Sequence, residues 1–225
     1  MTTTPKTLTV TEIHQLLDEL LRKAGTAKQS ARGVRNYTIA CLMVEAGLRV
    51  GEVVKMRWCD LYFNWEPVKS IIIPAEIAKN KRERQIPVSA RLADALTEYR
   101  RVVDTSKLEY LPCFFGLGKR SYEPLTTRQV ERFIRKAAEK AIGRPIHPHI
   151  LRHTFATRLM RVTNSRVVQE LLGHDSMTST QIYMHPNAED LKEAVDKLNE
   201  PEAVGVGGEQ STESGTGVTD RGDTR

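Results

Sequence analysis

The sequence is poor in cysteine and has no long apolar run. Its 225 residues include three cysteines, Cys41, Cys59 and Cys113, and so few, scattered thiols fit a reducing compartment better than a disulfide framework. No apolar run approaches the roughly 20 residues that a membrane-spanning helix needs. The N-terminal segment MTTTPKTLTVTE is polar and has no signal-peptide core. These absences argue against a secreted disulfide scaffold and a membrane protein, and they predict a cytoplasmic protein.

Two signatures of phosphate chemistry are also absent. The sequence has no Gly-rich loop ending in Lys-Ser or Lys-Thr, which would cradle nucleotide phosphates. It has no cluster of carboxylates of the kind that holds metal ions for phosphoryl transfer. The histidines lack the close spacing of a structural zinc site, although a zinc hydrolase that uses them remains an alternative that metal analysis would test. We therefore expect no cofactor and no metal.

Positive charge is plentiful but unevenly distributed. The net charge is +6 and the isoelectric point is about 9.3. Residues 201–225 carry five acidic side chains and two arginines, so the rest of the chain carries +9. A basic body fits an anionic partner, most often nucleic acid, although charge alone fits an ordinary basic protein equally well. The Gly-, Ser- and Thr-rich stretch 200–225 predicts a disordered acidic tail after one domain of residues 1–199.

Apolar spacing along the chain predicts a mainly α-helical domain with one small antiparallel β-sheet, an α+β fold. Helices are expected from an N-cap at Thr11, over 35–47 up to Gly47, around 51–56, over 89–103, 127–142, 148–163 and 165–172 up to Gly173, and after Pro186. Residues 24–33 are expected to form a polar link. The β-branched runs 68–76 and 84–89 predict a hairpin with a charged tip between them.

The stretch HPHILRHTFATRL, residues 147–159, has the pattern of a helix with one buried face, because large apolar side chains recur every fourth residue. His149 and Arg152 lie three residues apart beside that apolar stripe, on neighbouring positions of one helix face. We expect both side chains to reach the same ligand, while the buried stripe holds the helix in place.

Four more residues with charged or reactive side chains lie in three other stretches. Arg49 follows a predicted helix break, Lys79 lies at the hairpin tip, His174 follows a helix end, and Tyr183 comes nine residues later. With His149 and Arg152 they predict a phosphate site: guanidinium groups pair with phosphate oxygens, imidazoles move protons, and a tyrosine hydroxyl can attack phosphorus. Each residue alone has an ordinary structural explanation, but the combination is far more specific.

These stretches resemble motifs of the tyrosine recombinase (phage integrase) family. The segments EAGLRVGEVVKMRWCDL, KNKRERQIPV, HPHILRHTFATRL and VVQELLGHDSMTSTQIYMH each match one motif, and the resemblance covers roughly residues 8–198. It implies the catalytic-domain fold of that family. It also implies a catalytic set, with Glu52 at a supporting acidic position; the set is Arg49, Lys79, His149, Arg152 and His174 around the phosphate, and Tyr183 as nucleophile.

The resemblance implies a site-specific recombinase or integrase that acts on double-stranded DNA without metal or ATP. Tyr183 would form a 3′-phosphotyrosyl link and free a 5′-hydroxyl, and Lys79 is the expected general acid. Residues 187–199 are expected to pack on another copy in a homo-oligomer, a tetramer, on DNA. Surface residues of the hairpin and of the 127–142 helix are expected to contact DNA; they are Arg82, Arg84, Thr127, Arg128 and Gln129.

The chain departs from the resembled family near its start. Most members carry a helical core-binding domain before the catalytic domain, whereas here the motifs begin early, as in a fragment or in a catalytic-domain-only recombinase like the fimbrial phase-switch enzymes. Two other functions stay open: strand relaxation like that of a type IB topoisomerase, and non-catalytic regulation of recombination sites. A suicide substrate that traps a covalent adduct and a supercoil relaxation assay would discriminate them.

Overall fold

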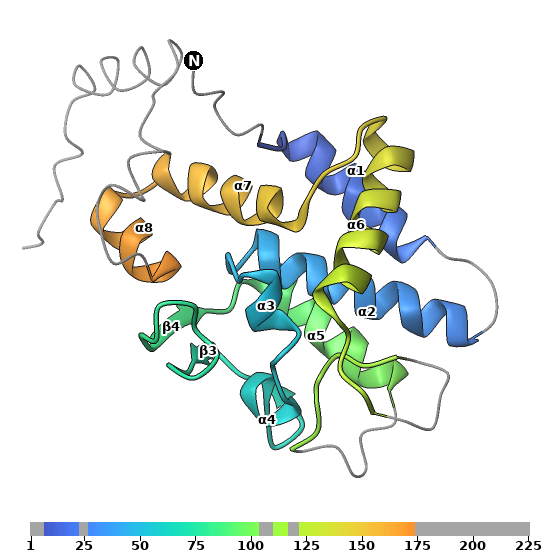
Figure 1. Ribbon diagram of the computed structural model, residues 1–225, viewed down its shortest axis with the longest axis horizontal. Helices are drawn as coiled ribbons and strands as arrows, with labels where there is room; N and C mark the ends of the chain where they lie inside the picture. The colour runs from blue at the N-terminus through green and yellow to red at the C-terminus, as the bar shows by residue number, and fades with distance from the viewer. Residues whose placement is uncertain (1–6, 23–26, 104–109, 117–121, 174–225) are drawn as a thin grey trace, which may run out of the picture. The chain divides into compact units, whose positions relative to one another are not determined.

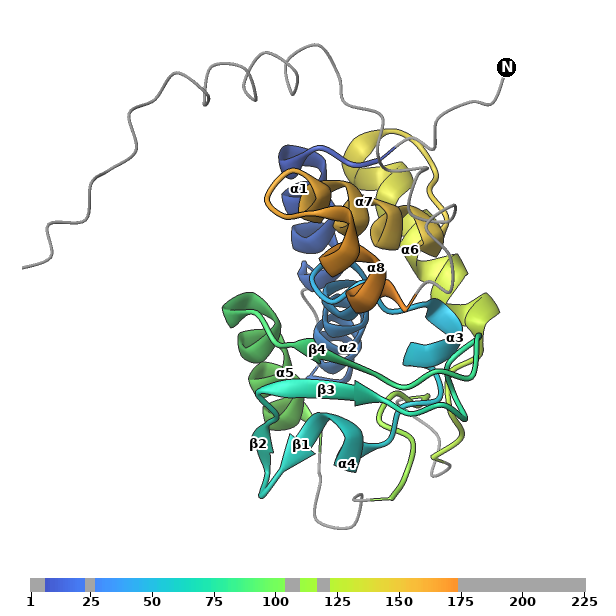
Figure 2. The same ribbon diagram turned by 90° about the vertical axis from the view of Figure 1, so that its left-hand side faces the viewer.

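Helix α2 (Ala27–Val44) is the element around which the other helices pack (Figures 1 and 2). Residues 39–44 of this helix are completely buried, because α1 (Val10–Leu21), α5 (Ala90–Val102), α6 (Thr127–Ile142) and α7 (Pro148–Met160) all contact it. A helix segment that is apolar on every side is typical of a core position. The computed structural model describes residues 7–22, 27–103, 110–116 and 122–173, all within one compact unit, Met1–His185.

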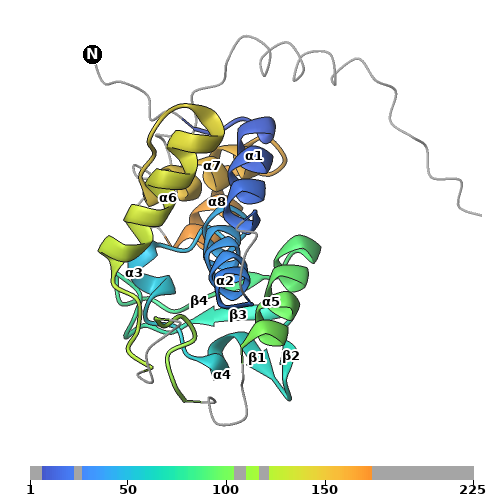
Figure 3. The ribbon, with the colours of Figure 1, turned by 90° about the vertical axis from the view of Figure 1, so that its right-hand side faces the viewer.

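Shorter elements complete the described fold. α3 (Val50–Val53) and α4 (Trp58–Leu61) are single turns, and α8 (Ser165–Leu172) follows α7. β1 (Tyr62–Phe63) pairs with β2 (Glu66–Pro67), and β3 (Ser70–Ile73) pairs with β4 (Arg84–Pro87), both antiparallel. Figure 3 shows α5 and α6 on opposite sides of α2. None of the helices in these ranges is long and apolar enough to span a bilayer.

The β3–β4 register decides which side chains of this hairpin face the core. Ile71 pairs with Ile86, and Ile73 pairs with Arg84. Side chains alternate between the two faces of a strand, and accordingly Ile71, Ile73 and Ile86 are buried while Ile72 is exposed. Arg84 shares the buried face, so its guanidinium is directed into the protein rather than toward solvent.

Polar side chains and glycines set the helix ends. Thr9 rather than Thr11 caps α1, and the Thr9 and Glu12 side chains each accept the other's backbone N–H. The predicted cap at Thr11 is therefore wrong by two residues. Asn164 caps the start of α8. Gly173 ends α8 in the left-handed conformation, φ +61°, which confirms the predicted helix end.

The mainly helical fold with a small antiparallel β component is confirmed, but its details differ from the prediction. α2 begins at Ala27, so the polar link predicted over 24–33 is wrong from that residue onward. A Cβ at Gly33 would lie 3.1 Å from the Leu20 carbonyl oxygen, so this glycine permits close packing of α1 and α2 instead of ending a helix. The sequence prediction lacks α4 and the β1–β2 hairpin, because two-residue strands are too short to show periodicity. The helix expected after Pro186 lies outside the described residues.

Candidate active site

A glycine turn between α2 and α3 positions Arg49. Gly47 has φ +63°, a conformation that favours glycine, and a Cβ there would lie 2.4 Å from the Phe155 ring. Arg49 follows this turn and keeps its side chain 18% exposed. Glu52 in α3 accepts the Arg49 backbone N–H at 2.8 Å, and its carboxylate pairs with the Arg49 guanidinium at 3.1 Å. Glu52 therefore holds Arg49 at both the backbone and the side chain.

Arg84 holds the other side of the same carboxylate. Its Nη1 contacts Glu52 Oε1 at 3.0 Å and its Nη2 contacts Oε2 at 2.7 Å, and both side chains are nearly inaccessible to solvent. Two parallel contacts of this kind are strong and directional. The prediction that Arg84 contacts DNA from the hairpin surface is therefore wrong, because its inward-facing position in β4 commits the guanidinium to Glu52.

Glu52 stays charged despite its burial. Burial raises the pKa of this carboxyl, but the hydrogen bonds and charge of Arg84, the Arg49 backbone N–H and the charge of Arg152 together lower the pKa below its ordinary value. Glu52 is therefore an anion at neutral pH. Within the described part of the site, three guanidinium groups thus share one carboxylate, which leaves a surplus of positive charge.

Arg152 ties helix α7 to two other parts of the site. Its side chain is buried, and it donates from Nη1 to the Gly47 carbonyl and from Nη2 to the Leu172 carbonyl, the latter at 2.7 Å. One acceptor belongs to the turn before Arg49 and the other to the last turn of α8. The guanidinium is therefore fixed in orientation by backbone groups that other elements supply.

His149 lies in a strongly basic part of the structure. Burial lowers this pKa, the charges of Arg152, Arg49 and Lys79 lower it further, and Glu131 on α6 opposes them. Charges perturb a pKa appreciably only at short range, so the structure brings these four predicted site residues together. With a lowered pKa, the imidazole is neutral near pH 7 and can accept a proton.

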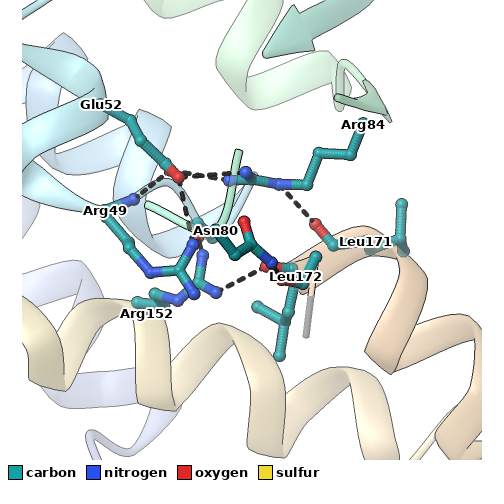
Figure 4. A network of polar contacts seen from close by, with 9 residues as sticks. Arg49, Glu52, Asn80, Arg84, Arg152, Leu171 and Leu172 are labelled. Atoms are coloured by element: carbon teal, nitrogen blue, oxygen red, sulfur yellow. Dashed lines mark hydrogen bonds and ion pairs between the residues drawn. The ribbon is translucent and has the colours of Figure 1, made fainter. Parts of the chain in front are cut away.

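The C-terminal end of α8 is held by donors from three surrounding elements (Figure 4). The carbonyl of Leu171 accepts from Arg84 Nε at 3.2 Å, that of Leu172 from Arg152, and that of Gly173 from the side-chain amide of Asn80. The last carbonyls of a helix have no partner within the helix. Strand β4, helix α7 and the β3–β4 hairpin tip supply those partners here, directly before His174.

The hairpin tip that carries Lys79 is anchored at its next residue. Lys79 itself is exposed, Ala78 before it is buried, and Asn80 donates to the Gly173 carbonyl. Lys81 has φ +52° and closes the turn. Asn80 is a site residue that the sequence prediction missed, because its partner is 93 residues away in the sequence and no local spacing indicates the contact.

The remaining predicted residues lie at the surface or beyond the described chain. Arg82 and Arg128 are exposed, and Thr127 is half-buried. Gln129 is exposed too, but its Oε1 accepts the Thr126 backbone N–H at 2.8 Å in the cap of α6. His174 and Tyr183 lie outside the residues that the structure describes. Over the described ranges, no three His, Cys, Asp or Glu side chains are grouped so as to hold a metal ion.

Sequences of known proteins match most of this chain. The profile of the phage integrase family matches residues 6–190. The tyrosine recombinase of Pseudothermotoga lettingae is 34% identical over 170 residues, which cover 75% of this chain and 56% of the relative. Tyrosine recombinase XerA of Pyrococcus furiosus is 33% identical over 209 residues, covering 92% of this chain and 66% of the relative. The chain thus spans between 56% and 66% of the length of these two relatives.

Solved structures share the arrangement of the elements. A crystal structure of XerA recombinase superposes with a TM-score of 0.66 at 27% identity, covering 88% of this chain and 67% of that chain. XerH site-specific recombinase in a post-cleavage complex with palindromic difH substrate superposes with a TM-score of 0.65 at 24% identity, covering 88% of this chain and 54% of that chain. The second likeness shows the fold alone.

Proposed function

Because this chain belongs to the phage integrase family, we propose that it is a site-specific recombinase that cleaves and rejoins DNA strands through a covalent phosphotyrosine intermediate. The observation that carries the proposal is the cluster of Arg49, Arg84 and Arg152 around the single carboxylate of Glu52. The pentacoordinate phosphorus of the transition state carries more negative charge than a phosphodiester. Oriented guanidinium groups therefore stabilise the transition state more than the bound substrate.

The proposed reaction is a pair of transesterifications. The Tyr183 hydroxyl oxygen attacks phosphorus, the bond from phosphorus to the 5′-oxygen breaks, and Lys79 donates a proton to that leaving oxygen. The tyrosine proton passes to a neighbouring base, a role for which the neutral imidazole of His149 is suited. Arg49 and Arg152 bind the non-bridging oxygens. A 5′-hydroxyl of a second strand then reverses the step, so the energy of the phosphodiester bond is retained.

Other residues have positioning roles in this proposal. Glu52 and Arg84 orient Arg49, and Asn80 holds the hairpin that carries Lys79. His174 is assigned a hydrogen bond to the scissile phosphate. The surface residues proposed to contact the DNA flanks are Arg82, Thr127, Arg128 and Gln129.

We infer duplex DNA as the partner, since the chain upstream of residue 201 carries +9. We further propose a single domain over residues 1–199 with a disordered tail over 200–225, and a homotetramer on DNA in which residues 187–199 contact a neighbouring copy. The mass of the DNA complex in native mass spectrometry tests that assembly. A DNA substrate and free cysteines, of which Cys41 and Cys113 are buried, fit the cytoplasm.

The replacement Tyr183→Phe tests the chemistry. It removes the one hydroxyl that the proposal uses as nucleophile, and we expect it to abolish a denaturation-resistant protein–DNA adduct on a nicked suicide substrate. Duplex binding, measured by fluorescence anisotropy, should stay within about twofold because no phosphate-binding charge is lost. Tyr110→Phe is the matched control, since this tyrosine is 73% exposed on the surface and lies far from the residues of the proposed reaction in the sequence.

Each outcome selects a function. Adduct formation by the wild-type chain and by Tyr110→Phe, but not by Tyr183→Phe, supports the recombinase mechanism. An adduct that persists in Tyr183→Phe removes Tyr183 from its role. Binding without an adduct in the wild-type chain favours a non-catalytic regulator, and relaxation of supercoiled DNA without strand exchange favours a type IB topoisomerase activity.

A further inference from the structure

A basic pocket of about 490 Å³ lies between α2 and α6, which contact each other in the fold (Figure 1). The pocket is lined by Arg32, Arg35, Asn36, Gly116, Leu125, Gln129, Arg132, Phe133 and Lys136. Four of these residues carry positive charge, and none of these lining residues is acidic. A concave site of this size is within the range of ligand pockets, and its charge indicates an anionic ligand.

Arg35 is the buried member of this pocket. Only 7% of the residue is exposed, yet its guanidinium bonds to neutral acceptors: the Phe115 carbonyl at 2.7 Å and the Asn36 side-chain oxygen at 2.9 and 3.2 Å. Burial lowers the pKa of Arg35, nearby Tyr99 opposes that shift, and the charge of Arg32 adds to it. A buried charge is costly without a counter-charge, and no described carboxylate is hydrogen-bonded to or paired with this one.

Two exposed residues extend the same surface. Arg132 and Lys136 are exposed on α6, and they are four residues apart, so both side chains lie on one face of the helix. Phe133, between them on the same helix, also lines the pocket. The guanidinium groups of the pocket arginines and the ammonium group of Lys136 can donate hydrogen bonds to the oxygens of a phosphate, and each guanidinium can donate two of them in parallel.

The pocket and the proposed reaction site use different sides of α6. Glu131 lies near enough to His149 to affect its pKa, whereas the next residue, Arg132, lines the pocket. At about 100° per residue, the pocket residues on α6, which are Gln129, Arg132, Phe133 and Lys136, share one face of the helix, and Glu131 lies roughly opposite to that face. A ligand in the pocket is therefore held beside the reaction site, with α6 between them.

We propose that the basic pocket binds a phosphate of the DNA backbone other than the one that is cleaved. The choice of DNA as the source of this phosphate rests on the proposed function, whereas the affinity of the pocket for phosphate does not. The pocket then acts as a second anchor for the duplex: it sets affinity and register, while the chemistry takes place on the other side of α6.

The test compares two double variants of α6 that lose equal charge. Arg132→Gln with Lys136→Gln removes two charges from the pocket. Arg135→Gln with Lys140→Gln is the matched control, because these exposed residues are paired with Glu139 and Glu19 outside the pocket. Binding of a 30-base-pair duplex, about three helical turns of arbitrary sequence, is measured by fluorescence anisotropy over a range of salt concentrations.

We expect the pocket variant to bind about tenfold more weakly than the control, the effect of one lost charge-assisted contact. Its slope of log K against log salt should be smaller by about 1, since one phosphate fewer is neutralised. Equal slopes and affinities for the two variants would overturn the proposal. Thermal unfolding of both variants checks that each is folded. Arg35→Lys keeps the positive charge but loses the paired N–H donors of the guanidinium group, and it should weaken DNA binding as well.

A second measurement identifies the source of the phosphate. Inorganic pyrophosphate alone is added to the wild-type chain and the pocket variant, and the unfolding temperature is recorded. Stabilisation by pyrophosphate that the pocket variant loses, with no change in its DNA binding, would assign the pocket to a free phosphate and overturn the DNA assignment. Covalent adduct formation does not enter either measurement, so failure of the recombinase proposal and failure of this one are distinguishable.

Discussion

At the scale of single residues, Glu52 controls the charge balance of the site. We predict that Glu52→Gln lowers the free energy of unfolding by about 3–5 kcal/mol, because it leaves the buried Arg84 guanidinium without its counter-charge. Urea denaturation at neutral pH measures the change. The control is Glu139→Gln, which breaks the exposed pair with Arg135 and should cost less than about 1 kcal/mol. Similar losses for both variants would contradict the central role of Glu52.

The loss of stability caused by Glu52→Gln depends on pH. The folded state lowers the pKa of Glu52, so the carboxylate contributes stability above its ordinary pKa, and that contribution is lost as pH falls through the lowered value. The difference in stability between wild-type and Glu52→Gln should therefore be full at pH 7 and should shrink in acid. If the difference in stability grew as pH fell, the Glu52 carboxylate would not contribute the stability proposed for its charged form.

The sequence predicts some residues of the site better than others, and burial explains the difference. Arg49, Lys79 and the pair His149 and Arg152 lie in three separate stretches, but reactive side chains and motif resemblance indicated each one, and the charges of Arg49, Lys79 and Arg152 all act on His149 in the structure. The error at Arg84 has a different origin: a basic residue in a charged hairpin suggests a surface position, and the strand register that turns it inward becomes visible only in the fold.

At the scale of elements, the α2–α3 turn depends on Gly47. We predict that Gly47→Ala destabilises the fold by about 2–4 kcal/mol, from the left-handed backbone and the clash with the Phe155 ring. It should also slow adduct formation, since the Gly47 carbonyl orients Arg152. Gly51→Ala is the control: nothing lies within 4 Å of its Cβ position in α3, so stability should stay equal or rise by up to about 1 kcal/mol. Thermal unfolding and adduct yield measure both variants.

The predictability of the elements follows their length. The long helices α5, α6 and α7 repeat the apolar pattern over three or more turns, and their predicted bounds agree with the structure to within about three residues. The single turn α4 and the strands of the β1–β2 hairpin have two to four residues each, which is too few for a periodic pattern to repeat. The polar link predicted over 24–33 is wrong from Ala27 onward for another reason: these polar residues lie in helix α2, where Gly33 allows a close contact with α1.

At the scale of the whole molecule, the tail composition leads to a prediction about stability. We predict that a chain truncated after residue 199 unfolds at the same temperature as the full chain, because residues 200–225 offer almost no large apolar side chain to bury. Differential scanning calorimetry of the two chains measures this. A fall of more than about 4 °C, which for this size corresponds to roughly 1 kcal/mol, would show that the tail contributes to the folded domain.

The capped end of α8 links the hairpin tip to the start of the segment that leads to Tyr183. Asn80 on one side and Arg152 on the other hold two successive carbonyls, Leu172 and Gly173. Coupling free energies are reciprocal, so if phosphate binding at Lys79 favours the hairpin-tip contact of Asn80 with Gly173, as the proposed mechanism implies, that contact in turn favours phosphate binding. In the proposed mechanism, substrate binding therefore favours the state in which the hairpin tip and the end of α8 are held together.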